Sequence, residues 1–242
     1  MLPKIDVPTF RISLPSDERI IQVRPFLVKE EKILLIAAES KDPEEMTQAI
    51  LQVIDNCIVD AGQDPYNLDR RPFFDIEYLF TALRAKSISE NIDINFQCNQ
   101  MDGEDYCGNI FEVKLDILEA QVSKSSIDIS DKIEFSSTAG VKMKYPSYKD
   151  ANTTTENGID RKINLIQNSI DYIYDGETIH SRKDISEEEL SEFIDNLTSD
   201  QFNKMEFWVN NLPSLMIEKT RVCEKCKYEH KLVYDDFDSF FL

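Results

Sequence analysis

Residues 94–117, INFQCNQMDGEDYCGNIFEVKLDI, and residues 215–236, LMIEKTRVCEKCKYEHKLVYDD, share one pattern. In each stretch an alternating segment leads into a cysteine, polar turn residues follow, and a second alternating segment leaves the last cysteine. The pattern predicts two β-hairpins with a cysteine pair at each tip, Cys98 with Cys107 and Cys223 with Cys226. Brought tip to tip, these hairpins would offer four thiolates in a tetrahedron, the arrangement that structural zinc prefers.

The spacing of the two cysteine pairs decides how specific this prediction is. Cys223 and Cys226 are separated by two residues, as in a zinc knuckle, whereas eight residues separate Cys98 from Cys107. The usual separation is about two to four residues. A redox pair at Cys223 and Cys226 is disfavoured because the pair ends a strand instead of opening a helix. Disulfides or buried thiols remain open interpretations, and His230, in the outgoing strand, is a further candidate ligand.

Composition limits the class of protein. The chain has 242 residues, enough for one large domain or two small ones, and 41% of them are hydrophobic, with 14 Phe, which indicates a globular protein. No apolar run approaches about 18 residues and the amino terminus lacks a charged-then-apolar pattern, so we expect neither a membrane span nor a signal peptide. The reducing compartment that this implies favours metal over disulfides for the cysteines.

The charge balance bears on the partners. With 46 acidic and 27 basic residues, the net charge is −19. Such a surface repels the phosphates of nucleic acids and anionic lipids. We therefore expect no direct nucleic-acid binding, and a partner protein with a basic or mixed-charge surface.

The first third of the chain predicts a hairpin followed by helices. Alternating segments at 9–14 and 20–24 flank the turn residues 15–17. Helices are expected at 25–40, from 42 to just before Gly62, and at 75–88. The second helix has an Asp42 cap, a proline at its first position and a glutamate three residues after the cap. Cys57 lies on its apolar face and is expected to be a buried thiol.

The second half predicts weaker strands, a linker and more helices. Strands are expected within 125–147, and the sequence DANTTTENG at 150–158 is the best candidate linker. Capping boxes at Ser186 and Thr198 predict two helix starts. One further helical stripe is expected before Asp175, formed by Ile163, Ile166, Ile170 and Ile173.

These elements predict an α+β fold in which antiparallel hairpins pack with helices. The zinc-ribbon-like pair of cysteine hairpins would be split by a helical insertion. The expected division is a main domain at 1–150 and 212–242, and an insertion at 159–211.

Signals for catalysis are scarce. His180 and His230 are the only histidines, and neither lies near a candidate nucleophile in sequence. No glycine-rich phosphate loop, serine nucleophile elbow or His-Glu-x-x-His helix occurs. The acidic run Glu187–Glu189 is explained by a helix amino terminus. A four-cysteine zinc lacks the open coordination position that catalysis needs. We therefore expect no enzyme.

Four segments carry a family resemblance. The segments at 23–40 (VRPFLVKEEKILLIAAES), 75–90 (DIEYLFTALRAKSISE), 94–115 (INFQC through YCGNIFEVKL) and 223–241 (CEKCKYEHKLVYDDFDSFF) resemble the baseplate hub and hub-assembly proteins of T-even-type contractile-tailed bacteriophages. The first three cover most of 20–118, while about 119–210 carries little resemblance. The strongest motifs are Arg24–Glu30 and Leu83–Ser87.

The resemblance implies a viral protein made in the host cytoplasm and needed to build the central hub of the tail baseplate. It would bind hub or tape-measure proteins, either as a tail assembly chaperone that leaves or as a component of the virion. The basic side chains of Arg24, Lys29, Arg84 and Lys86 either contact such a partner or pair with the local acidic residues. Two other functions stay open: a zinc-ribbon adaptor that contacts a polymerase, and a hub-associated hydrolase that uses two carboxylates.

Overall fold

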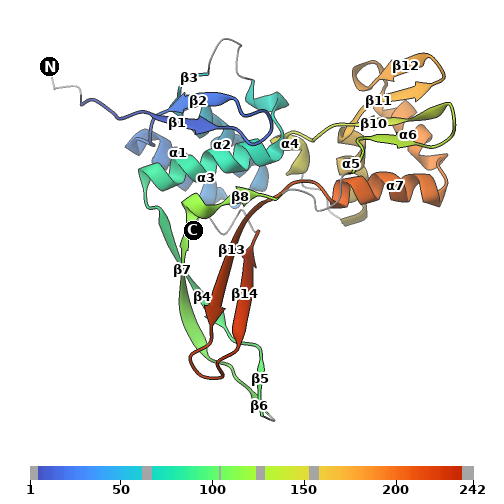
Figure 1. Cartoon of the computed structure of the whole chain (residues 1–242). Helices are drawn as coiled ribbons and strands as arrows, with labels where there is room; N and C mark the ends of the chain where they lie inside the picture. The colour runs from blue at the N-terminus through green and yellow to red at the C-terminus, as the bar shows by residue number, and fades with distance from the viewer. Residues whose placement is uncertain (1–4, 62–66, 104, 124–128, 153–157, 236–242) are drawn as a thin grey trace.

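The computed structural model describes residues 5–61, 67–103, 105–123, 129–152 and 158–235. Within these ranges the chain forms antiparallel sheets and seven α-helices, which confirms the predicted α+β class. Figure 1 shows a body of helices, a second lobe beside it, and a long arm of paired strands that points away from both. None of the helices in the described ranges is long and apolar enough to cross a bilayer.

The body combines a small sheet with three helices. The sheet has the order β1-β2-β3, with β1 (Phe10–Ser13), β2 (Ile20–Val23) and β3 (Ile58–Asp60). The helices are α1 (Val28–Ser40), α2 (Pro43–Cys57) and α3 (Phe73–Ser87), and a short 3-10 turn, η1 (Leu68–Arg70), precedes the third. The predicted first hairpin and three helices are confirmed. The core between them is apolar and includes Ile21, Ile50, Ile54, Leu79 and Phe80.

The start of α2 follows the local sequence, but its end does not. The Asp42 side chain accepts a hydrogen bond from the backbone N–H of Glu44 (2.8 Å), and Pro43 opens the helix. The helix ends at Cys57, four residues before the expected boundary, because residues 58–60 pair with β2 as β3. A three-residue strand gains its stability from that pairing, so the sequence alone gave no signal for it.

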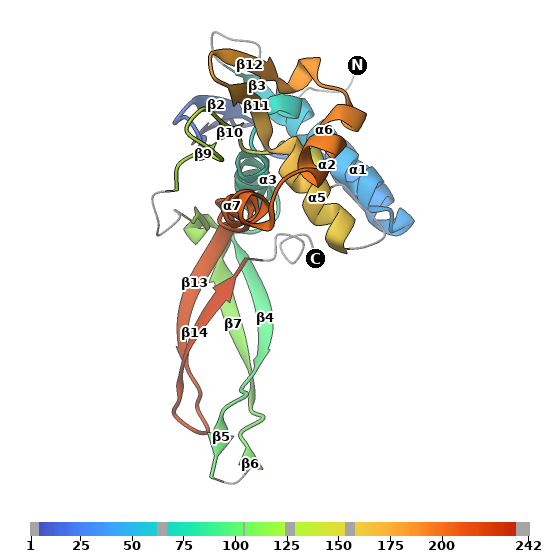
Figure 2. The same ribbon diagram turned by 90° about the vertical axis from the view of Figure 1, so that its right-hand side faces the viewer.

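The arm consists of two antiparallel hairpins that lie side by side (Figures 1 and 2). The first pairs β4 (Asn91–Gln97) with β7 (Ile110–Asp116), and a small ribbon of β5 (Met101–Asp102) and β6 (Asp105–Tyr106) extends its end. The second pairs β13 (Leu215–Val222) with β14 (Glu229–Tyr234). Both predicted hairpins are confirmed.

Alternation of side chains explains why the hairpins pack face to face. Buried residues at every second position form one apolar cluster between them, which includes Ile92, Val113, Leu115, Ile217 and Leu232. At the base of the arm, η2 (Ile117–Glu119) leads into β8 (Gln121–Val122), which pairs with the start of β13. Ala85 of α3 packs on the same cluster, so the arm is rooted in the body.

The second lobe is a four-stranded sheet covered by helices. The sheet order is β12-β11-β10-β9, with β9 (Lys132–Glu134), β10 (Ala139–Met143), β11 (Ile170–Asp175) and β12 (Thr178–Ser181). The helices are α5 (Gly158–Asn168), α6 (Glu187–Asp195) and α7 (Ser199–Asn210), with a 3-10 turn η3 (Arg182–Asp184). The short helix α4 (Tyr148–Ala151) lies between the two parts of the molecule, and its Tyr148 packs in the core of the body. The capping boxes predicted at Ser186 and Thr198 are confirmed.

The prediction of one helical stripe from Ile163 to Ile173 is wrong beyond Asn168. The helix α5 ends there, and Ile170 and Ile173 belong to β11, which pairs with β10. β-Branched and aromatic residues dominate 170–174 and favour a strand. Gly176, with φ of 60°, then supplies the turn to β12.

The chain leaves the body and returns to it at one place. The backbone N–H of Ser123 donates to the C=O of Ser214 (2.7 Å), next to the β8–β13 pairing. Between these two points, residues around Tyr148 dock back on α3. Residues 153–157 of the predicted linker lie outside the described residues, as does the carboxyl-terminal DSFFL. The division into 1–150 with 212–242 and 159–211 remains a prediction.

Candidate metal centre

The four cysteines lie where the two hairpins of the arm end. Cys98 directly follows β4 and Cys107 precedes β7, while Cys223 follows β13 and Cys226 lies in the turn before β14. The first pair extends the strand ladder, because the backbone N–H of Cys98 donates to the C=O of Asn109 (2.8 Å). Side-by-side packing of the hairpins thus brings both pairs to one position near the end of the arm (Figure 2).

The sulfur atoms have the spacing of a four-coordinate metal site. All four Sγ atoms lie within 4.8 Å of one another, and the Cys98–Cys226 and Cys107–Cys223 distances are both 3.7 Å. Sulfur atoms about 2.3 Å from a central zinc would be about 3.8 Å apart in a regular tetrahedron. Disulfide sulfur atoms are about 2.05 Å apart, and all these cysteines are free. The arrangement can therefore hold a metal ion.

The site is dry. Cys98, Cys107 and Cys223 are buried, and Cys226 is partly buried. Four thiolates packed at this depth repel one another strongly unless a cation lies between them. The burial therefore favours either protonated thiols or a bound metal.

The turn around Cys223 prepares that thiol to ionise. Backbone N–H groups of Cys226 and Lys225 lower the pKa of Cys223 to about 6, although burial opposes them. Lys227 adopts a left-handed φ of 62°, and its N–H donates to the C=O of Cys223 (2.9 Å), which closes the turn. In contrast, burial raises the pKa of Cys98 to about 12. Cys223 is therefore more easily deprotonated than Cys98.

Three side chains surround the cluster. His230 is buried, and its Nε2 lies 3.2 Å from Cys98 Sγ, while the ring packs edge-on against Phe96. His230 therefore lies beside the four cysteines as a hydrogen-bond partner of Cys98. Asn109 Nδ2 donates to Cys223 Sγ (3.6 Å), and Lys225 Nζ donates to the C=O of Cys107 (2.8 Å). Such outer contacts fix the ligand side chains of metal sites.

The sequence pattern indicated His230 but not Asn109 or Lys225. Lys225 lies between the knuckle cysteines, and its Nζ binds the C=O of Cys107, so a basic residue inside the Cys-x-x-Cys turn was the available signal. Asn109 has no comparable signal, because its contact to Cys223 joins residues 114 positions apart.

Cys57 is buried at the end of α2 and lies outside the cluster, as expected. Burial raises its pKa to about 11. A thiol with so high a pKa stays protonated at neutral pH and behaves as a small apolar side chain.

Local pairing accounts for three of the four basic residues that were considered as partner contacts. Arg24 and Lys29 bind Glu30 (3.0 and 3.3 Å), and Lys86 binds Glu90 (2.7 Å). Arg84 is buried in α3, and its Nη1 has no hydrogen-bond partner among the described residues.

The acidic run at the start of α6 acts as predicted. Glu189 accepts a hydrogen bond from the backbone N–H of Ser186 (2.9 Å), which completes the capping box. His180 is exposed on β12. Neither feature brings an acid or base against a nucleophile.

A comparison with protein families finds a match. A family model described as "T4 bacteriophage base plate protein" matches residues 7–242, which include both hairpins of the arm and the second lobe. No curated protein and no solved structure matches the chain. Because the match spans nearly the whole sequence, the chain belongs to the T4 bacteriophage base plate protein family.

Proposed function

We propose that this baseplate protein acts in the central hub, as an assembly or structural protein that binds other hub or tape-measure proteins. The observation that carries the proposal is the family match over residues 7–242. Baseplate membership implies a structural role, tail proteins as partners and the virion baseplate as a location. The assignment to the central hub is supported in addition by the family resemblance of four segments, which include Arg24–Glu30 and the Cys223–Cys226 knuckle.

The chemistry of the chain supports binding instead of catalysis. The densest cluster of reactive groups among the described residues is a closed set of four cysteines, which leaves a metal no open position for a substrate. The net charge of −19 favours basic or mixed-charge protein partners in the host cytoplasm.

A conditional knockout of the gene in the phage tests this function. We expect infected cells to accumulate other tail proteins but few complete baseplates in electron micrographs, and a plasmid copy of the gene to restore them. Normal baseplates in the knockout would exclude the proposed role. Antibodies against the chain, applied to purified virions, distinguish a retained hub component from an assembly chaperone that leaves.

A polymerase adaptor is the second candidate, because the arm resembles a zinc ribbon. A tagged chain isolated from infected cells distinguishes the two functions. Tail proteins as the main partners support the baseplate role, and polymerase subunits support the adaptor.

We also propose that Cys98, Cys107, Cys223 and Cys226 hold one structural zinc ion. The support is the 3.7 Å sulfur spacing, the burial and the preference of zinc for four thiolates. The ion would tie together hairpins whose cysteines are 116 positions apart. Elemental analysis of protein purified without chelator should give about one zinc per chain. Metal-free protein whose melting temperature does not respond to added zinc or chelator would refute the site.

A further inference from the structure

The four cysteines of the cluster differ in their access to solvent. Cys98, Cys107 and Cys223 are 1%, 3% and 0% exposed, whereas Cys226 is partly exposed. Cys226 lies in the turn between β13 and β14, and the residue on either side of it is exposed. A reagent in solution therefore meets Cys226 before it meets the other three cysteines.

Nitrogen donors are distributed unevenly over the same four sulfur atoms. Asn109 Nδ2 donates to Cys223 Sγ (3.6 Å), and two backbone N–H groups reach the same atom. His230 Nε2 lies 3.2 Å from Cys98 Sγ. Among the described residues, no side-chain nitrogen donates to Cys226, which has a backbone N–H as its donor. The most accessible cysteine of the cluster thus lacks the side-chain donor that two of the buried cysteines have.

A bound zinc ion would make access decisive. In the metal-free chain, Cys223 ionises more easily than Cys98. Zinc ligands are deprotonated whatever their pKa is in the metal-free protein, so all four sulfur atoms would be thiolates. A thiolate reacts with an electrophile only if the electrophile can reach it. The zinc-bound cluster would therefore contain four nucleophiles, of which solvent reaches one.

Hydrogen bonds to sulfur reduce its reactivity further. An N–H donor withdraws electron density from a thiolate, and a less basic sulfur is a weaker nucleophile. A thiolate has no proton to donate, so in the zinc-bound state His230 Nε2 would carry the hydrogen and Cys98 Sγ would accept it. Asn109 would act on Cys223 in the same way. Contacts of this kind around metal ligands typically change metal affinity by about 10- to 100-fold.

We propose that Cys226 is the one reactive ligand of the zinc site, where a thiol-reactive electrophile attacks and from which the zinc ion is released. Burial protects the other three cysteines, and the nitrogen donors of Asn109 and His230 protect two of them further. This inference rests on the zinc site proposed above and identifies the point at which that site can be opened.

Loss of this ligand would weaken the connection between the two hairpins. The closest sulfur pairs both join one hairpin to the other, Cys98 with Cys226 and Cys107 with Cys223 (both 3.7 Å). A blocked Cys226 leaves the second hairpin with a single cysteine at the site. Three thiolates hold zinc more weakly than four, so zinc release should follow the block.

Limited alkylation of the full-length, zinc-loaded chain with N-ethylmaleimide tests the proposal. The Cys226 sulfur adds to the C=C bond of the maleimide, and the neighbouring ring carbon takes a proton from water, which leaves hydroxide. The thioether that forms carries no charge and is a poor zinc ligand. Peptide mass spectrometry should find the first adduct on Cys226, and a chromogenic chelator should record about one zinc ion released per adduct.

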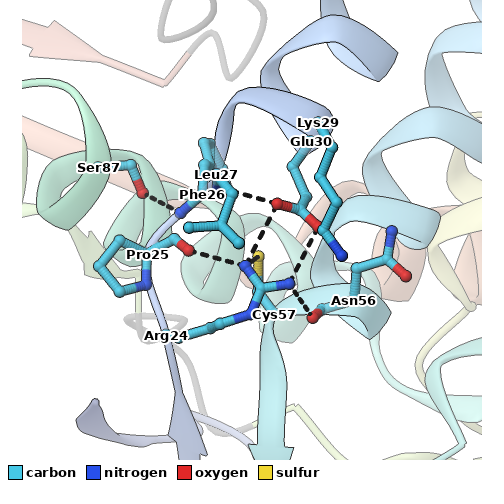
Figure 3. Close-up of polar contacts among 9 residues, drawn as sticks. All are labelled: Arg24, Pro25, Phe26, Leu27, Lys29, Glu30, Asn56, Cys57 and Ser87. Carbon is cyan, nitrogen blue, oxygen red and sulfur yellow. Dashed lines mark hydrogen bonds and ion pairs between the residues drawn. The ribbon is translucent and has the colours of Figure 1, made fainter. Parts of the chain in front are cut away.

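Cys57 provides an internal control in the same experiment. It is fully buried, and its Sγ lies 3.8 Å from Arg24 Nη1 (Figure 3). Burial raises its pKa to about 11, so it should stay unmodified while the chain is folded. A first adduct on Cys57 or on any of the three buried cluster cysteines would overturn the proposal. An adduct on Cys226 that leaves the zinc in place would do the same.

Replacing Asn109 tests the protection of Cys223. Asn109→Ala should move part of the first adduct to Cys223 and speed zinc release about tenfold. Asn99→Ala is the matched control, because Asn99 is exposed on the same hairpin and its side chain contacts Gln100 instead of a sulfur atom. This control should react like the wild type.

Replacing His230 tests the protection of Cys98. His230→Phe keeps an aromatic ring beside Phe96 but removes the N–H, so adducts on Cys98 should appear. Zinc content and circular dichroism before alkylation identify any variant that does not fold, and the adduct map of the wild type then decides alone. Unchanged adducts and release rates in both folded variants would refute the protective role of the two nitrogen donors.

The same samples separate the role of Cys226 from the existence of the zinc site. If the chain contains zinc but the first adduct lies on a buried cysteine, the site stands and Cys226 is not its reactive ligand. If the chain neither contains nor takes up zinc, the site itself is refuted, whatever the order of alkylation. First modification of Cys226 with loss of zinc supports both.

Discussion

Glu30 is a buried charged residue, and no sequence pattern predicts its burial. Its carboxylate is fully buried. Burial by itself raises the pKa of Glu30, but hydrogen bonds from Arg24 and from the N–H of Leu27 outweigh it and lower the pKa below its ordinary value. Because the folded pKa lies below that of the unfolded chain, the ionised group stabilises the fold above the unfolded pKa, about 4.3. That contribution is lost as the pH falls through the folded pKa.

Replacing Glu30 should therefore cost stability in a pH-dependent way. We expect Glu30→Gln to lower the free energy of unfolding at pH 7 by about 3 kcal/mol, because Arg24 loses its charged partner. The difference from the wild type should shrink as the pH falls below about 4.3. Urea unfolding followed by circular dichroism measures both effects. The control Glu90→Gln, in a half-exposed pair with Lys86, should change stability by less than about 1 kcal/mol.

A second prediction at the scale of single residues concerns the cysteines. Cys223→Ser should abolish stoichiometric zinc, because three thiolates and a serine hydroxyl bind zinc far more weakly than four thiolates. Cys57→Ser should leave the zinc content unchanged, since that thiol lies outside the cluster. Zinc is measured by elemental analysis after gel filtration. Retention of a full equivalent by Cys223→Ser would show that the metal, if present, is held elsewhere.

Among the elements, the two hairpins of the arm should behave as one unit. Their cysteines meet although they are more than a hundred positions apart, so a bound ion would fasten each hairpin to the other. Removal of zinc by a chelator should therefore speed amide exchange near the cysteines in both β4–β7 and β13–β14. The β11–β12 hairpin, which holds no cysteine, provides the matched control and should exchange unchanged. Faster exchange confined to one hairpin would argue against a shared ion.

The elements also show where sequence patterns succeed. The helix starts at Ser186 and Thr198 were predictable, because a capping box is made by residues three apart. The strand β11 was not. Ile166 and Ile170 are both fully buried at helical spacing, yet the chain changes from helix to strand between them. Pairing with β10, a distant segment, decides the conformation of Ile170.

At the scale of the whole molecule, the backbone hydrogen bond between Ser123 and Ser214 (2.7 Å) brings the two ends of the segment 124–213 together. Replacing 124–213 by a short glycine-containing turn should therefore leave the arm and its zinc binding intact. We expect some loss of thermal stability, because Tyr148 no longer packs on the body core. Elemental analysis and circular dichroism measure the two effects. A shortened chain that cannot bind zinc would show that the lobe is needed to form the arm.

The sequence by itself determined the α+β class, both cysteine hairpins and the absence of a recognisable catalytic motif. These features depend on residue spacing along the chain. Apolar residues alternate with polar ones before and after each cysteine pair, and capping residues lie next to the helices that they start. The tertiary structure decided that Cys98 meets Cys226, that His230 and Asn109 touch the cluster, and that Glu30 is buried beneath Arg24. Each of these depends on packing between segments far apart in sequence, and no local pattern specifies which distant surface a side chain will meet.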